Sequence, residues 1–218
     1  MRLVIAEDSV LLREGLSRIV ADNGMTVVAQ VSDAHALRAA VDEHQPDAVL
    51  TDIKMPPGFR TEGLEAAADI KSRFPRIGVL VLSQYVEADY AMKVMNSGGG
   101  VGYLLKERLG KVDELLDAIR RVGVGGNVID PEVVDALISQ EQAKSHFAEM
   151  TPREKEILGL MAQGWSNTAL SDRLHVSPKT VETHIGRIFN KLGLHPAPEG
   201  HRRVLAVLAY LSSTAART

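Results

Sequence analysis

Short apolar runs rich in β-branched residues alternate with segments of helical periodicity through the first 125 residues. The runs predict five strands, at Leu3–Glu7, Val27–Val31, Ala48–Asp52, Gly78–Leu82 and Gly102–Leu105. The segments that follow them predict helices at Leu11–Asn23, Ala34–His44, Leu64–Phe74, Ala88–Asn96 and Val112–Val122. Because right-handed crossovers join parallel strands, this order predicts a doubly wound α/β domain: a five-stranded parallel sheet with helices on both faces.

The remainder of the chain is helical in pattern. Asp130-Pro131 resembles an N-cap followed by proline and predicts a helix over about 131–143, and the polar stretch 140–148 predicts a linker. Thr151-Pro152-Arg153-Glu154 has the form of a capping box. Helices are then predicted at about 152–163, 167–174, 178–192 and 201–212. We therefore expect one domain over 1–125, a linker helix and linker over 126–149, and a small all-α domain over 150–218.

The net charge of −3 conceals a difference between the two ends of the chain. Residues 1–150 hold 16 basic and 23 acidic residues, a net −7, whereas residues 151–218 hold 9 and 5, a net +4. A basic end indicates a possible contact with nucleic acid. The chain has no cysteine, which excludes disulfides and thiolate metal sites, and it has no apolar run of the roughly 20 residues that span a bilayer. We expect a cytoplasmic protein without a membrane partner.

Polar residues stand where the predicted strands end. The first strand ends at Glu7-Asp8, the third at Asp52, the fourth at Ser83 and the fifth at Lys106. Ligands of open parallel sheets bind at the carboxyl ends of the strands, so these side chains are expected to converge. Three carboxylates would repel one another unless a cation lies between them, and hard oxygen ligands suit Mg²⁺. A remaining carboxylate can attack a phosphoryl group, while the hydroxyl donates a hydrogen bond to one phosphoryl oxygen and the ammonium neutralises another.

With these motifs in place, residues 1–125 resemble the receiver domain of response regulators, which has a flavodoxin-like sheet. The resemblance rests on four motifs: Ile5-Ala6-Glu7-Asp8, Leu50-Thr51-Asp52-Ile53-Lys54-Met55-Pro56, Val81-Leu82-Ser83 and Gly102-Tyr103-Leu104-Leu105-Lys106. It implies that Asp52 accepts a phosphoryl group from a sensor histidine kinase. It also implies that Mg²⁺ is held by Glu7, Asp8, Asp52 and the backbone carbonyl of Lys54. Ser83 and Tyr103 would form the switch pair, and Lys106 would sense the phosphate.

The predicted helices 167–174 and 178–192 are joined by a tight turn, a spacing typical of a helix-turn-helix whose second helix reads a DNA groove. On that helix Val181, Ile185, Ile188 and Leu192 follow the helical period and are expected to face the core. The outward set includes Lys179, Thr180, Glu182, Thr183, Gly186, Arg187 and Lys191.

Residues 150–212 resemble the LuxR-type helix-turn-helix of the NarL/FixJ response regulators. The resemblance rests on Met150-Thr151-Pro152-Arg153-Glu154, Gly164-Trp165-Ser166-Asn167, Ser177–Ile185 and Lys191-Leu192-Gly193. It implies binding to double-stranded DNA, with Glu182, Thr183 and Gly186 at the base-facing positions. Residue types suit Lys179, Thr180, Arg187 and Lys191 to phosphate contacts. An apolar stripe on the last helix, formed by Val204, Leu205, Leu208 and Leu211, predicts a homodimer at least on DNA.

Two other functions remain open from the residues. A phosphohydrolase of the haloacid-dehalogenase type uses similar groups, but it needs a general acid two residues after the nucleophile, where this chain has Lys54. A receiver-type DNA binder that works without phosphorylation is the other alternative. We expect a transcription regulator and not an enzyme.

Overall fold

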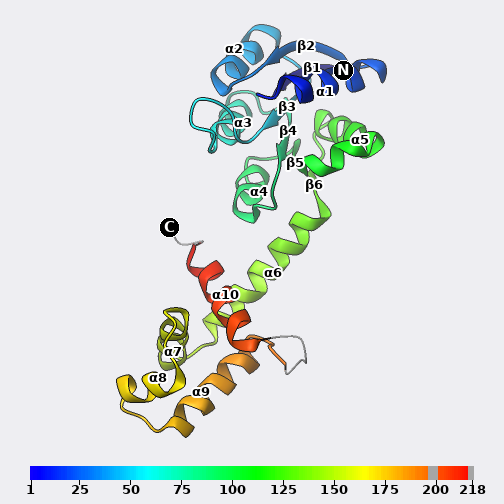
Figure 1. Cartoon of the computed structure of the whole chain (residues 1–218). Helices are drawn as coiled ribbons and strands as arrows, with labels where there is room; N and C mark the ends of the chain where they lie inside the picture. The colour runs from blue at the N-terminus through cyan, green and yellow to red at the C-terminus, as the bar shows by residue number, and fades with distance from the viewer. Residues whose placement is uncertain (196–200, 216–218) are drawn as a thin grey trace. The chain divides into compact units, whose positions relative to one another are not determined.

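The computed structural model describes residues 1–195 and 201–215, and the chain divides into two compact units, Met1–Ala136 and Leu137–Thr218. The division falls within the long helix α6 (Pro131–Ala148), which is labelled in Figure 1.

The first unit is a parallel sheet with strand order β2-β1-β3-β4-β5-β6. The strands are β1 (Arg2–Ala6), β2 (Thr26–Val31), β3 (Ala48–Asp52), β4 (Gly78–Ser83), β5 (Val101–Leu105) and β6 (Val128–Ile129). The helices are α1 (Val10–Asp22), α2 (Ala34–His44), α3 (Glu62–Arg73), α4 (Ala88–Met95) and α5 (Val112–Gly123), with a 3₁₀ turn, η1, at Lys106–Gly110. The doubly wound α/β fold predicted from the sequence is confirmed.

Helices cover both faces of the sheet (Figure 1). One face packs against α1 and α5 through an apolar cluster that takes alternate residues of the strands, for example Leu3 and Ile5 of β1. The intervening residues of β1, Val4 and Ala6, are also buried, and α2, α3 and α4 contact the sheet strands as well. A strand that is buried on both faces shows a continuous apolar run, which is why the central strands stood out in the sequence.

The strand count predicted from the sequence is wrong by one. The extra strand β6 has two residues, which pair in parallel with β5 at Gly102 and Tyr103. Two residues are too few to show a period of two, so the pattern could not reveal this strand.

The helix predicted to end near 143 also differs, because α6 continues to Ala148 through the stretch expected to be a linker. That stretch contains good helix formers and neither glycine nor proline. Weak periodicity shows that a segment lacks one strongly apolar face; it does not show that the segment is unwound.

The second unit contains α7 (Pro152–Ala162), α8 (Asn167–Leu174), α9 (Pro178–Lys191) and α10 (Arg202–Ala215) around one apolar core. The capping box predicted at Thr151 is confirmed. The Glu154 amide donates to the Thr151 hydroxyl at 3.3 Å, and the Thr151 amide donates to the Glu154 carboxylate at 2.8 Å. None of the described helices has the length and apolar character needed to cross a bilayer.

Candidate functional site

The strand ends bring three carboxylates together. Glu7 follows β1, Asp52 is the last residue of β3, and one oxygen each of Glu7, Asp8 and Asp52 lie within 4.8 Å of one another. Glu7 is 1% exposed and Asp52 is 7% exposed, so both charges are held largely away from water. Burial raises the pKa of Glu7, and the nearby ammonium of Lys106 only partly offsets this effect.

Lys106 supplies the positive charge of this cluster. Its ammonium donates to Oε2 of Glu7 and to Oδ2 of Asp52, each at 2.8 Å, although Glu7 lies 99 positions away along the chain. Burial lowers the pKa of Lys106, but its hydrogen bonds to Asp52 and Glu7 outweigh that effect and leave the pKa raised. The ammonium therefore stays charged and occupies a position between two carboxylates, as a bound cation would.

The orientation of Glu7 depends on neighbours that the sequence pattern did not indicate. Its Oε1 accepts from the backbone amide of Ser9 at 3.3 Å, and its backbone carbonyl accepts from the Arg13 guanidinium at 2.5 Å. Ser9 is also the N-cap of α1. A single serine thus starts the helix and holds the deepest carboxylate of the cluster.

The two predicted switch residues meet at one backbone oxygen. The carbonyl of Tyr85 accepts from the Ser83 hydroxyl at 2.8 Å and from the Tyr103 hydroxyl at 3.1 Å. The Tyr103 side chain is fully buried, and burial raises its pKa, so the phenol remains a donor. If Ser83 turned toward another acceptor, Tyr103 could keep the Tyr85 carbonyl satisfied.

Lys54 lies at the edge of the cluster. Its ammonium is 3.1 Å from Oε1 of Glu87 and 5.3 Å from the centre of the Tyr85 ring. With Asp52 and Lys106 it lines an open depression of about 600 Å³ over the carboxylates, which leaves access for a small phosphorylated donor. The predicted role of its backbone carbonyl as a metal ligand stays a prediction.

Close backbone packing of α3 against the end of β3 fixes the position of Asp52. Gly63, in the first turn of α3, lies so close that a Cβ atom there would be 1.7 Å from the Asp52 carbonyl oxygen. Its amide also donates to the Ile53 carbonyl at 2.9 Å. Only glycine allows this approach of α3 to the end of β3.

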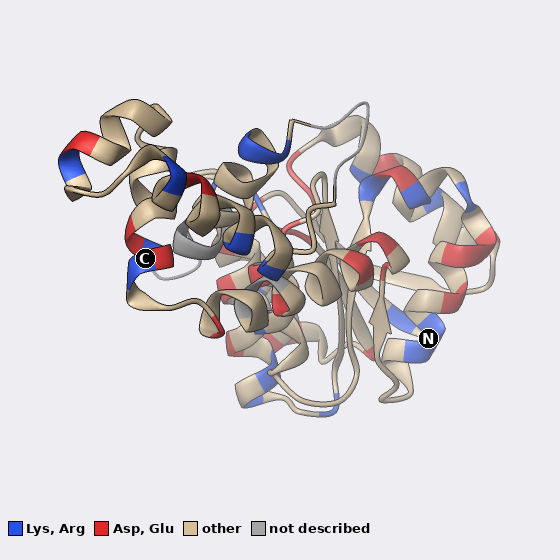
Figure 2. Cartoon of the chain, turned by 90° about the horizontal axis from the view of Figure 1, so that it is seen from below, with Lys and Arg blue, Asp and Glu red and all other residues tan. Residues whose placement is uncertain are grey.

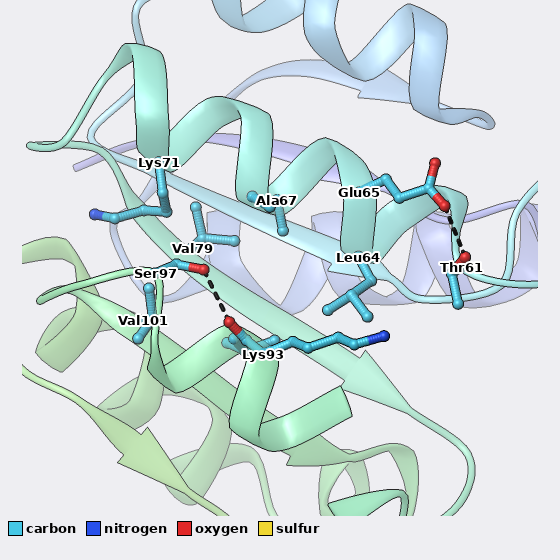
Figure 3. A pocket seen from close by; sticks show the side chains of 11 residues that line it. Thr61, Leu64, Glu65, Ala67, Lys71, Val79, Lys93, Ser97 and Val101 are labelled. Atoms are coloured by element: carbon cyan, nitrogen blue, oxygen red, sulfur yellow. Dashed lines mark hydrogen bonds between the residues drawn. The ribbon is translucent and has the colours of Figure 1, made fainter. Parts of the chain in front are cut away.

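A separate hollow of about 230 Å³ lies between α3 and α4, and Figure 3 shows the side chains that line it. Its walls are mainly apolar, with Leu64, Ala67 and Val79 among them, and the Thr61 hydroxyl on its rim is bonded to Glu65 at 2.8 Å. None of the clustered carboxylates of the strand ends reaches it, so we do not assign it to the same chemistry.

The second unit shows the predicted helix-turn-helix, α8 and α9. Ser177 caps α9 by accepting from the Thr180 amide at 3.1 Å, and Val181, Ile185 and Ile188 are buried as expected. Phe189 is also buried, which the predicted core set did not include, whereas Leu192 is only partly buried. Phe189 lies four residues after Ile185, so it belongs to the same apolar face of the helix.

The residues predicted to contact DNA do not share one environment. Lys179, Glu182, Thr183 and Arg187 are exposed, and Thr180 and Gly186 are half-buried. Lys191 differs: its ammonium is 2.7 Å from Oε2 of Glu154, which is 2% exposed, and 2.9 Å from the carbonyl of Glu149. Figure 2 shows how charged residues of both signs are distributed over the chain.

Family comparisons divide the chain in the same order as the geometry. Residues 3–120 match the response regulator receiver domain, and residues 148–208 match the bacterial regulatory proteins of the luxR family. The oxygen regulatory protein NreC of Staphylococcus aureus is 36% identical over 209 residues, which cover 91% of this chain and 94% of NreC.

Solved structures agree in fold. A structure of the RcsB response regulator of Salmonella typhimurium, determined to study conformational dynamism for DNA interaction, aligns with a TM-score of 0.59 and 25% identity and covers 98% of this chain and 99% of its own. A LuxR-family DNA-binding response regulator from Staphylococcus aureus aligns at 28% identity with a TM-score of 0.50, over 56% of this chain and 98% of its own.

Proposed function

Because this chain is a response regulator of the NarL family, with a receiver domain and a LuxR-type DNA-binding domain, we propose that phosphorylation of Asp52 controls its binding to double-stranded DNA. The observation that carries the proposal is the cluster at the strand ends. There Asp52 shares an ammonium with a buried glutamate and faces an open depression.

The phosphoryl donor would be a sensor histidine kinase, the partner that a receiver implies. A carboxylate oxygen of Asp52 forms the bond to phosphorus while the bond between phosphorus and the donor nitrogen breaks, and that nitrogen keeps its electron pair and takes up a proton. Lys106 already donates to Oδ2 of Asp52, which supports attack by the other oxygen. The Lys106 ammonium would then neutralise one phosphoryl oxygen, and the Ser83 hydroxyl would donate a hydrogen bond to another.

The acidic cluster fits a divalent cation. Three hard oxygen donors lie within 4.8 Å of one another, and two of them belong to buried residues. Mg²⁺ is usually held by one or two carboxylates together with water and phosphate oxygens, which this set can supply. We propose that Glu7, Asp8 and Asp52, with the Lys54 carbonyl, hold Mg²⁺. When bound, Mg²⁺ supplies charge neutralisation for the transferring phosphoryl group.

The test of the acceptor is labelling of the full chain by acetyl phosphate with Mg²⁺, followed by intact mass. Wild-type protein should gain one phosphoryl group, and Asp52→Asn should gain none. Asp22→Asn is a suitable control, because Asp22 is an exposed acid on α1 with a side chain 71% exposed. Labelling that persists in Asp52→Asn would place the acceptor elsewhere.

DNA contacts are proposed for α9. Lys179 and Arg187 are its exposed basic residues and suit phosphates. The Thr183 hydroxyl donates to the Lys179 carbonyl at 2.8 Å, which leaves its methyl group available for a thymine methyl. Thr183→Ala should therefore change base preference, whereas Arg187→Ala should weaken binding to all sequences and lower its salt dependence by about one unit of slope. A uniform loss from Thr183→Ala would contradict the assignment.

A homodimer on DNA is proposed through α10. On α10, Val204 is 55% exposed and Leu205 is 45% exposed, whereas Ala206 is fully buried in the core of the unit. Two copies that joined along this apolar face would present two reader helices to a two-fold operator with half-sites about one helical turn apart.

We propose that the protein is a cytoplasmic regulator and not an enzyme. The phosphohydrolase alternative requires an acid two residues after Asp52, and the side chain there is the Lys54 ammonium, paired with Glu87. Sustained hydrolysis of p-nitrophenyl phosphate would revive that alternative. Operator binding that is equal with and without acetyl phosphate would favour the phosphorylation-independent alternative.

A further inference from the structure

Asp130 is a fully buried carboxylate outside the acidic cluster, at the junction between β6 and α6. The Arg108 guanidinium makes a bidentate ion pair with it: Nε donates to Oδ2 at 3.1 Å and Nη2 donates to Oδ1 at 3.2 Å. Oδ1 also accepts from the Glu132 amide at 3.1 Å, as an N-cap of α6 does. This bidentate pair therefore fixes where α6 begins.

The same carboxylate is bonded to the strand that carries Lys106. Oδ2 of Asp130 accepts from the Leu105 amide at 3.3 Å, and the Asp130 amide donates to the Tyr103 carbonyl at 2.9 Å. Leu105 immediately precedes Lys106, and Arg108 follows it by two positions. The backbone of Lys106 is thus held on both sides by one side chain at the start of α6, where β6 runs beside β5 (Figure 1).

Lys106 needs this support because its ammonium must reach two acceptors at 2.8 Å at once. It stands at the first position of η1, a 3₁₀ turn with no side-chain cap of its own. The guanidinium of Arg108 also donates to Oε1 of Glu132 at 2.9 Å, a second link between η1 and α6. Without these links the end of β5 and the start of η1 would be fixed by strand pairing and by the apolar packing of residues such as Leu104 and Leu109.

We propose that Arg108 and Asp130 are positioning residues for phosphoryl transfer at Asp52: the ion pair at the start of the helix that leads to the DNA-binding unit holds Lys106 in the acceptor site. The proposal rests on the proposed phosphorylation of Asp52. It makes the β6–α6 junction part of the phosphorylation machinery. By linkage, events at Lys106 must also act on the junction.

The experiment measures phosphorylation of the full chain by acetyl phosphate as a function of Mg²⁺ concentration. Asp130→Asn replaces one acceptor oxygen with an NH₂ group, which opposes the donors around it. We expect the maximal rate to fall about tenfold, as for a misplaced catalytic group. The Mg²⁺ concentration for half-maximal rate should stay within about twofold, because the carboxylates of the cluster are unchanged.

Arg108→Gln breaks the same pair from the other side, so the double variant should be no slower than either single variant. Arg108→Lys keeps the positive charge but cannot make the bidentate contact, so its maximal rate of phosphorylation should lie between those of the wild-type protein and Arg108→Gln. Should Asp130→Asn fail to fold, the Arg108 variants make the test. Asp22→Asn, in an exposed Arg–Asp pair on α1, should leave the rate unchanged.

Wild-type rates in Asp130→Asn and Arg108→Gln would overturn the proposal. So would an equal shift of rate and Mg²⁺ requirement together with a lower melting temperature, since that pattern indicates general loss of structure. Amide exchange at Glu132 gives a second measurement: phosphorylation of wild-type protein should change its protection, and no change would overturn the linkage. Labelling of Asp52→Asn tests the proposed acceptor separately.

Discussion

Replacing Lys106 with methionine removes the only ammonium bonded to Glu7 and Asp52 in the part of the chain that the structure describes. At 2.8 Å and an effective dielectric constant of about 20, the gross attraction is ~6 kcal/mol for each carboxylate. Desolvation of the ammonium offsets much of this. Breaking a buried pair by removing one partner typically costs about 3–5 kcal/mol. The Lys106 side chain is 21% exposed, so we expect the lower end, ~3 kcal/mol of unfolding free energy at pH 8.

The loss should depend on pH because Glu7 can take up a proton. Burial already raises the pKa of Glu7 in the folded protein, and without Lys106 it should rise further. A carboxyl whose folded pKa is raised contributes stability that is full below its unfolded pKa and disappears as pH rises through the folded value. Lys106→Met should therefore be least destabilised near pH 5 and most destabilised near pH 8.

Mg²⁺ should reverse the loss. A ligand at about 100 times its dissociation constant stabilises the folded state by about 2.7 kcal/mol. In the wild-type protein the Lys106 ammonium already neutralises part of the carboxylate charge, whereas in the variant Mg²⁺ would be the only cation beside the carboxylates. Urea unfolding of both proteins at pH 8, with and without Mg²⁺, measures the two increments. The increment should be larger in Lys106→Met.

Lys111→Met is the matched control, because Lys111 forms an exposed pair with Glu114 and has a side chain 59% exposed. Its stability should change by well under 1 kcal/mol, with no special response to Mg²⁺. If Lys106→Met were as stable as wild type at pH 8 without Mg²⁺, or gained no more than wild type from Mg²⁺, the account of Lys106 as the resident counter-ion would be refuted.

Three further predictions concern other parts of the chain. Gly63→Ala places a Cβ 1.7 Å from the Asp52 carbonyl, so it should destabilise by at least about 1–3 kcal/mol in urea unfolding and slow labelling by acetyl phosphate, whereas Gly15→Ala, with open space around it, should do neither. Burial lowers the pKa of Lys71 in the folded protein below 10.5. A lowered pKa contributes stability that is present above pH 10.5 and is lost as the pH falls through the pKa of the folded state. The free energy of unfolding of the wild-type protein should therefore rise toward pH 10.5 relative to that of Lys71→Met, and a difference that does not change with pH would contradict this. Val204→Glu should reduce cooperative operator binding while leaving the melting temperature of the monomer within a few degrees, and unchanged cooperativity would count against the α10 interface.

The sequence predicted the elements whose buried residues form a recognisable apolar pattern, and it missed the element that is too short to show one. The central strands were apparent because both of their faces are covered. The pair β5–β6 was not, because two residues carry no pattern. Convergence of Glu7 on Lys106 was predictable across 99 positions, since a general rule places ligands at the carboxyl ends of parallel strands.

No such rule exists for pairs of charged side chains elsewhere. The bidentate contact of Arg108 with Asp130 joins positions 22 apart in the chain. The contact of Lys191 with the buried Glu154 joins positions 37 apart. Their residue types also occur on any solvated surface. Only the folded backbone brings the partners within 3.1 Å and 2.7 Å of each other.

These pairings change what the charge of the C-terminal unit means. Two of the basic residues of 151–218 are engaged within the unit: Lys191 pairs with the buried Glu154, and Arg203 donates to Oδ1 of Asn167 at 2.7 Å. Both side chains fasten helices to one another. On α9 the basic residues that remain for a polyanion are Lys179 and Arg187, so the contribution of α9 to the salt dependence of the proposed DNA binding should come from those two residues.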